Sequence, residues 1–182
     1  MSRYCSIGLN TNCAPLRLTM LAVFLATLAS PPSLRGQSIT PTRGAAADRA
    51  AQDSAAVADA LHRFLTAFEN LDWGPFRAAF SDSATIFQPV PEMAERVTGP
   101  RGIDSTFRAV FAAIRAHAAG GPPYQRLVPA DLWIQPLSPG LVLVTFQLRN
   151  AERLARRTVL FRHETAGWRI LHLHASNLAL KR

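Results

Sequence analysis

The sequence contains only two cysteines, Cys5 and Cys13, and both precede an apolar run at residues 18–29. A domain that begins after this run has no cysteine, which excludes disulfides, thiol nucleophiles and cysteine-ligated metal sites. The sequence also lacks an internal repeat of roughly 20–50 residues. It has no nucleophile elbow, phosphate-binding loop or metal-binding helix motif. Stability must therefore come from packing, and no motif of this kind indicates an activity.

A membrane-spanning run is also absent, because the apolar run of 12 residues is shorter than the ~20 residues that cross a bilayer. Arg3 and Arg17 precede this run and small residues follow it, a pattern typical of a secretory signal peptide. Cleavage after Ala29 and cleavage near Gly36 both fit, and an uncleaved membrane anchor is the alternative. No cysteine follows the run, so a lipid-modified cysteine is not expected.

This pattern predicts three segments. Residues 1–36 form a signal peptide with its tail, residues 37–52 a flexible lead-in, and residues 53–178 one folded domain. The protein is then secreted or periplasmic, without membrane contact after cleavage. Apolar residues make up 48% of the chain and charged residues 18%, which favours a folded domain over a disordered one.

Basic residues moderately outnumber acidic residues. Removing the signal segment leaves 17 basic and 12 acidic residues, a net charge of +5. The basic residues are scattered, and the one tight group is Arg153, Arg156 and Arg157 beside an expected hairpin turn. Nucleic-acid binding would need a basic stripe or interleaved aromatic residues. We therefore expect a solvated basic face and no nucleic-acid partner.

Three helices are expected before residue 120. The first begins near Asp53 or Ser54, which suit an N-cap, and continues with apolar residues at helical spacing. Asp72 is expected to cap a second, shorter helix, and a third spans about 102–117. A short strand is expected at 84–88 between the second and third helices.

The remainder of the chain has a strand-like pattern. Three or four runs, at 124–137, 140–149, 155–164 and 167–177, are joined by short turns, which indicates antiparallel hairpins. Helices followed by an antiparallel meander predict an α+β architecture. Neither face of the strands is plainly polar, so the sheet needs covering on both sides. Because the helices can cover only one side, we expect a homo-oligomer, a dimer at minimum.

Four stretches in register resemble one family. The final strand carries Trp168, His172, His174 and Ser176 in a closing Trp…His-x-His-x-Ser motif. The other stretches are 85–90 with 97–99, then 127–129, and 70–72, where Leu71 replaces the usual glycine. Together they resemble the SnoaL-like, nuclear-transport-factor-2-like superfamily, and most closely the association domain of calcium/calmodulin-dependent protein kinase II.

The resemblance implies a cone-like half-barrel, a cystatin-like roll in which a curved antiparallel sheet wraps around N-terminal helices and a cavity. That kinase domain lines its cavity with arginines, whereas the corresponding positions here are Gln147, Val159 and Ala175. We therefore expect a mainly apolar cavity that takes a small apolar molecule. The lining residues predicted for it are Thr145, Gln147, Arg149, Val159, Phe161, Phe76 and Phe111.

The sequence does not single out a catalytic residue. Asp131, His163, Tyr124 and Glu92 are the acid–base candidates, and Asp131 interrupts an apolar strand segment. His172 and His174 share a strand face and could bind a metal with a third ligand from Asp131, His163 or Glu164. A structural role for the two histidines is favoured, so no metal and no cofactor are expected.

Three functions remain in view because the superfamily is functionally diverse. The leading one is an exported ligand-binding protein with no assigned reaction. The alternatives are a cofactor-free isomerase, dehydratase or cyclase that uses acid–base residues in the cavity, and an oligomerisation or interaction module. Fold alone does not separate them.

Overall fold

The computed structural model describes residues 43–89, 95–149 and 153–180. The expected signal segment and Glu92 lie outside these residues. Helix α1 spans Arg43–Glu69, α2 spans Trp73–Ala78 and α3 spans Gly99–His117. The strands are β1 (Phe80–Phe87), β2 (Val97–Thr98), β3 (Ala130–Ser138), β4 (Leu141–Arg149), β5 (Arg153–Glu164) and β6 (Gly167–Ala179). None of the helices within the described ranges is long and apolar enough to cross a membrane.

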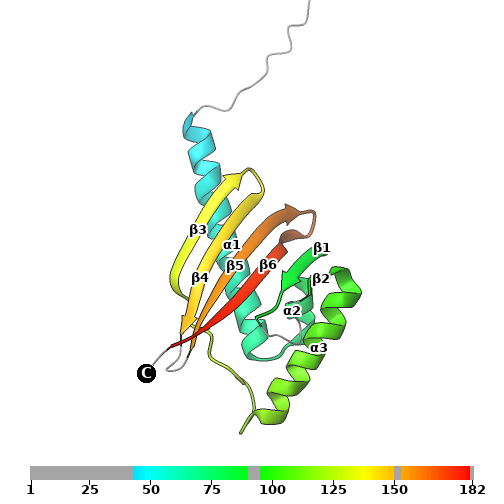
Figure 1. The fold of residues 1–182 in the computed structure, drawn as a ribbon. Coiled ribbons are helices and arrows are strands. Elements are labelled where there is room, and N and C mark those ends of the chain that lie inside the picture. Colours follow the sequence, from blue (N-terminus) through cyan, green and yellow to red (C-terminus); the bar gives the residue numbers. More distant parts are fainter. Residues whose placement is uncertain (1–42, 90–94, 150–152, 181–182) are drawn as a thin grey trace, which may run out of the picture. The chain divides into compact units, whose positions relative to one another are not determined.

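The strands form one six-stranded sheet in the order β2-β1-β6-β5-β4-β3. Strands β3 to β6 pair as consecutive antiparallel hairpins, and β1 pairs in parallel with β6 (Figure 1). The predicted α+β class is confirmed, with the sheet curved and open and the helices ahead of the meander. The parallel pairing was not predicted, because α3 and strands β2 to β5 lie between β1 and β6 in the sequence.

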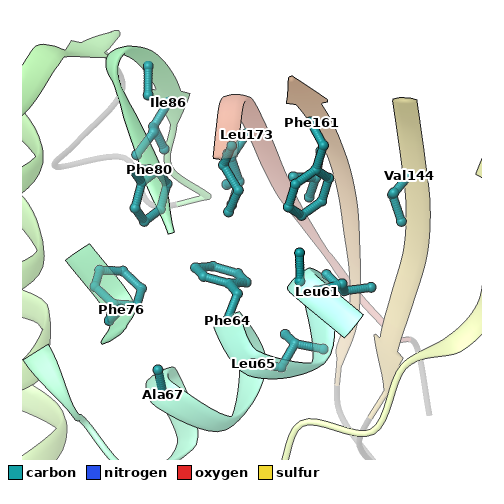
Figure 2. Packing of buried hydrophobic residues seen from close by; sticks show 14 of the residues in the cluster. Leu61, Phe64, Leu65, Ala67, Phe76, Phe80, Ile86, Val144, Phe161 and Leu173 are labelled. Atoms are coloured by element: carbon teal, nitrogen blue, oxygen red, sulfur yellow. The ribbon is translucent and has the colours of Figure 1, made fainter. Parts of the chain in front are cut away.

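One hydrophobic core lies between the helices and the inner face of the sheet (Figure 2). Leu61, Phe64 and Leu65 of α1 face this core, together with Phe76 of α2. Phe76 is fully buried and its ring packs against a cluster of six aromatic side chains: Phe64, Phe68, Trp73, Phe80, Phe107 and Phe111. Aromatic pairs at these spacings stabilise beyond the burial of their area, so this cluster fixes α2 and α3 against α1.

Helix α1 begins ten residues before the predicted start. The expected flexible lead-in is helical from Arg43, and only 37–42 lies outside the described residues. The two predicted capping residues are inside the helix, where Ser54 Oγ donates to the Ala50 carbonyl and Asp53 Oδ2 accepts from the Gly140 amide. Residues 44–52 are rich in alanine, whose high helix propensity extends the helix without an apolar period.

The other boundaries differ by smaller amounts. Asp72 is the N-cap residue of α2 as predicted, although its side chain makes no capping bond. The expected helix end at 81–83 is part of β1, and the segment 124–129 is not strand. In that segment, Glu69 of α1 accepts the Tyr124 amide on its main-chain carbonyl and the Leu127 amide on its carboxylate. The main chain there bonds to a helix instead of to a neighbouring strand.

Candidate functional site: a cavity with a cationic inner wall

A cavity of about 380 Å³ lies between α1, α3 and the inner face of β4 to β6. Its apolar wall consists of side chains from both helices and three strands, namely Phe64, Leu65, Phe68, Phe107, Val110, Ile114, Leu127, Phe146, Leu148, Leu173 and Ala175, with Pro89 beside them. Its polar residues are Gln88, Gln125, Arg153, Arg157 and Asn177. Of the described residues that line it, none is acidic, and none is a histidine or tyrosine.

The register of the sheet explains how an arginine comes to line this cavity. Phe146 of β4 pairs with Arg157 of β5, which pairs with Ala175 of β6. Directly opposite residues on neighbouring strands point to the same face. Phe146 and Ala175 are buried on the core face, so Arg157 also points toward the helices. One row of the inner face thus holds a guanidinium group between the side chains of Phe146 and Ala175.

Arg157 is held by main-chain oxygens. Its Nη1 donates to the carbonyl of Arg156 at 2.9 Å and to the carbonyl of Ser176 at 3.3 Å. Burial lowers the pKa of the Arg157 guanidinium, and the positive charge of Arg153 lowers it further. A charge that is buried near a like charge is destabilising unless it is paired. The cavity therefore has a site where negative charge would be stabilised.

Three lining residues also carry buried amide atoms that have no hydrogen-bond partner among the described residues. They are the Nε2 atoms of Gln88 and Gln125 and the Oδ1 atom of Asn177. A buried amide atom without a partner costs about 1–3 kcal/mol. Asn177 lies opposite Ala155 on β5, one row beyond Arg157. Asn177, Arg153 and Arg157 thus lie where β6 ends and β5 begins, whereas Gln88 follows β1 and Gln125 lies in the segment 124–129.

None of the seven residues predicted to line the cavity lines this one. Thr145, Gln147 and Arg149 point to the opposite face of β4, because Val144, Phe146 and Leu148 take the inner face. Four others are buried parts of the core: Phe76, Phe111, Val159 and Phe161. Phe161 also borders a smaller depression beside Trp168 and Gly167. The prediction for β4 differs because the more polar side of this strand is its outer face.

The three catalytic candidates within the described residues do not line the cavity. Asp131 is exposed on the edge strand, where its Oδ2 accepts from Gln147 Nε2 at 2.9 Å. His163 is exposed and stacks edge-on against Trp168 with ring centroids 5.2 Å apart. The ring of Tyr124 lies 5.6 Å from the Arg115 guanidinium carbon. These residues do not form one acid–base site.

The motif histidines lie on the outer face of the sheet, because the alternation of side chains along β6 reverses beyond Ile170. A bulge at Leu171 causes this, because Phe161 pairs with Ile170 and Leu160 pairs with His172. One extra residue reverses the alternation. Leu173 and Ala175 therefore join Ile170 in the core, and the imidazoles point outward.

His172 has a structural partner on β1. Its Nδ1 lies 2.7 Å from Thr85 Oγ1, and the ring of Phe87 packs beside it. Burial lowers the pKa of His172, and the nearby His174 lowers it further, against the opposing effect of the hydrogen bond with Thr85. Within the described ranges, no group of three or more His, Cys, Asp or Glu residues is arranged to hold a metal.

Glu164, proposed as a third metal ligand, is engaged elsewhere. Its Oε1 accepts from the buried Ser81 hydroxyl at 2.7 Å and forms an ion pair with Arg162. The hydrogen bond from Arg162 is the main cause that holds the pKa of Glu164 below its ordinary value, and that from Ser81 adds to it. This network ties the end of β5 to β1.

Sequence reasoning missed the arginine although a signal was present. Arg157 is in phase with Ala155, Val159 and Phe161, which are all buried. A charged residue at a core-facing position of a strand is unusual enough to suggest a functional site. The expected solvated basic face is therefore wrong for Arg157, although Arg156 is exposed as predicted.

The sequence profile of the SnoaL-like domain matches residues 57–180. Among curated proteins, none matches the chain. Similar solved structures include a putative dehydratase of the nuclear-transport-factor-2-like family from Streptomyces avermitilis, with 18% identity and a TM-score of 0.56 over 70% of this chain and 97% of that one. A cystatin-like protein from Caulobacter vibrioides has 14% identity and a TM-score of 0.56, covering 70% of this chain and 90% of that one.

A putative calcium/calmodulin-dependent protein kinase type II association domain from Thiobacillus denitrificans has 23% identity and a TM-score of 0.50, over 65% of this chain and 92% of that one. At these identities the structural neighbours establish the fold, and the profile match establishes the family. The predicted resemblance is thus confirmed: the chain belongs to the SnoaL-like domain family, with a nuclear-transport-factor-2-like, cystatin-like fold.

Proposed function

We propose that this protein binds a small molecule in the cavity between its helices and its sheet. The supporting observation is the composition of the lining, where an aromatic and aliphatic wall meets a small group of polar side chains. Small-molecule sites combine these two features, and their volumes run from about 300 to 1,000 Å³. The volume of about 380 Å³ fits a small ligand.

Binding is favoured over acid–base catalysis at this site. A cofactor-free isomerase or dehydratase needs a carboxylate or imidazole next to its substrate. The described lining supplies amides and guanidinium groups instead. Guanidinium and amide groups orient a ligand and stabilise its charge, but they do not remove a proton at neutral pH.

The test is binding of a neutral, apolar fluorescent probe, N-phenylnaphthylamine, to the full chain. We expect saturable binding to the wild-type protein. Ile114→Trp would reduce it at least tenfold, because Ile114 is half-buried in the wall of the cavity and the larger ring occupies the space. Circular dichroism and thermal melting check that the variant folds. Probe binding that is unchanged in this variant would place the binding elsewhere and contradict the proposal.

Self-association is a second proposal, which rests on the outer face of the sheet. The Trp133 side chain is 67% exposed on the edge strand β3, and Leu132 and Leu137 of the same strand are also exposed. Trp133 pairs with Thr145 of β4 on that face, which no described helix covers (Figure 1). We propose that a second copy covers this face, since exposed apolar side chains in a group are typical of interfaces. Light scattering tests it: a dimer is expected, Trp133→Arg should give a monomer, and a monomeric wild type would refute the proposal.

Export remains a proposal that rests on the residues 18–29 and the two arginines before them. Mass spectrometry of the protein recovered from an expressing bacterium would test it. We expect a mature chain that begins between residues 30 and 37. Recovery of the intact chain from the cytoplasm would contradict export.

A further inference from the structure

Arg157 places a guanidinium group in the wall of the cavity, and none of the printed hydrogen bonds of this group is to a carboxylate of the described residues. Arg157 lies on the core face of β5, and its described hydrogen bonds are to two main-chain carbonyls. Arg153, four residues earlier on the same strand, also lines the cavity and depresses the pKa of Arg157 by its charge. No acidic residue is found among the described residues of the lining. An anionic ligand would supply a counterpart for the charge of Arg157.

The unpartnered amide groups of the cavity lining favour the same kind of ligand. Gln88 and Gln125 each have a buried Nε2 group, a donor that has no acceptor among the described residues. Asn177 supplies one acceptor atom in the same condition. The Arg157 guanidinium and two amide donors against one acceptor describe a site for an acceptor-rich group. A carboxylate has about four acceptor positions and pairs with a guanidinium through two parallel hydrogen bonds.

The rest of the cavity is apolar and excludes a small hydrophilic anion as the best ligand. Phe64 and Phe68 of α1 and Phe107 of α3 line the wall, and Phe146 lies directly opposite Arg157. Burial of apolar ligand surface contributes about 25 cal/mol per Å². An acid without an apolar body would leave this wall unused.

We propose that the ligand is an amphipathic organic acid whose anionic group pairs with Arg157 and whose aromatic or aliphatic body lies against the phenylalanines. This inference rests on the proposed binding function and specifies its ligand class. It differs from the small apolar molecule that the sequence led us to expect. That expectation compared the positions of Gln147, Val159 and Ala175 and did not consider a cation at Arg157.

Two matched probes test the proposal on the full chain. Anilinonaphthalene sulfonate has an aromatic body and an anionic group, and N-phenylnaphthylamine has the same body without the charge. The variants are Arg157→Met and, as the matched control, Arg156→Met. Arg156 is the adjacent residue, exposed on the other face of β5, where its Nε donates to Ser176 Oγ at 3.2 Å. Arg157→Gln serves as a second neutral variant if methionine impairs folding.

We expect Arg157→Met to weaken the anionic probe about tenfold or more, because a charge-assisted hydrogen bond is lost. The neutral probe should change less than about twofold, and Arg156→Met should leave both probes at wild-type affinity. Equal loss of both probes in Arg157→Met, or an equal loss of the anionic probe in Arg156→Met, would overturn the inference while leaving the binding function in place. Failure of both probes to bind the wild type would overturn the binding function and the inference together.

Discussion

Phe146 on β4 and Arg157 on β5 are cross-strand partners, and both side chains line the cavity. An aromatic ring and a guanidinium group thus occupy one row of the inner face of the sheet. The ring belongs to the core, whereas the guanidinium is a charge in a place where protein interiors avoid charge. A residue that serves ligand binding in this position is expected to cost stability when no ligand is present.

The first prediction measures this cost. Arg157→Met should raise the free energy of unfolding of the ligand-free protein by about 1 kcal/mol, because a half-buried charge is replaced by an apolar side chain of similar length. Urea denaturation at neutral pH measures the change. The adjacent Arg156→Met, at an exposed position, should stay within about 0.5 kcal/mol of wild type. A loss of stability in Arg157→Met would mean that the bonds to the carbonyls of Arg156 and Ser176 hold the sheet together.

The second prediction concerns Glu164 at low pH. Hydrogen bonds from Arg162 and Ser81 hold the pKa of Glu164 below its ordinary value. A carboxyl group with a lowered folded-state pKa stabilises the protein above its unfolded-state pKa, roughly 4.3, and that contribution is lost as the pH falls through the folded value. Glu164→Gln should therefore be less stable than wild type at pH 7, with a difference that shrinks in acid.

Urea unfolding at several pH values provides the measurement. Because the Arg162–Glu164 pair is partly exposed, the difference at pH 7 should be at most about 1 kcal/mol. Glu95→Gln is a suitable control, since Glu95 is exposed. A difference between wild type and Glu164→Gln that stays constant down to acid pH would show that ionisation of Glu164 does not contribute.

The third prediction concerns His172 between neutral and mildly acidic pH. Burial and the neighbouring His174 lower the pKa of His172 in the folded protein. The unfolded chain then takes up a proton at a higher pH than the folded chain does. Stability from this residue is present above the ordinary histidine pKa of about 6.5 and declines as the pH falls from there toward the lowered value.

In His172→Gln, the fall in stability that protonation of His172 causes with falling pH should be absent. The measurement is the free energy of unfolding from about pH 7.5 to about pH 5, a range that includes the ordinary histidine pKa of about 6.5. His62→Gln, on the exposed side of α1, is the control and should keep the wild-type slope. If both variants retain the same slope as wild type, the decline does not come from His172.

The fourth prediction concerns Leu71, which has a φ of 52° and is 4% exposed. The left-handed conformation costs a residue with a Cβ atom about 1–2 kcal/mol, whereas a buried leucine contributes about 2–5 kcal/mol relative to alanine. Leu71→Gly should therefore lower the free energy of unfolding by about 1–3 kcal/mol, although glycine suits the backbone. Leu71→Ala should be at least as destabilised, because it loses the packing and keeps the strain. Glycine clearly worse than alanine would argue against strain at this position.

The fold was predictable because it depends on patterns that extend over many residues. Apolar spacing in α3 and short turns between the later strands indicated helices followed by an antiparallel meander, and the closing motif indicated the family. The helix start was missed because the alanine-rich segment from 44 to 52 has propensity but no period. Periodicity therefore located the core and did not locate the boundaries.

The candidate site was less predictable because it depends on which face of each strand points inward. On β4 both faces contain apolar residues, and the side with Thr145 was chosen although Phe146 takes the cavity side. On β6 the bulge at Leu171 has no glycine or proline to mark it. The unpartnered amides of Gln88, Gln125 and Asn177 come from three separate segments, so only the folded chain brings them together.

The bulge at Leu171 determines which side chains of β6 point toward the cavity. Strand β6 carries two alternative sets of side chains beyond Ile170, one with Leu173, Ala175 and Asn177 and the other with His172, His174 and Ser176. The extra residue decides which set meets a ligand, since faces exchange when the phase of a strand shifts by one. A continuous β6 without this bulge would present imidazoles and a hydroxyl to the interior from the same amino acids. Whether β6 presents apolar side chains or imidazoles to the interior therefore depends on the register of the strand as much as on its amino acids.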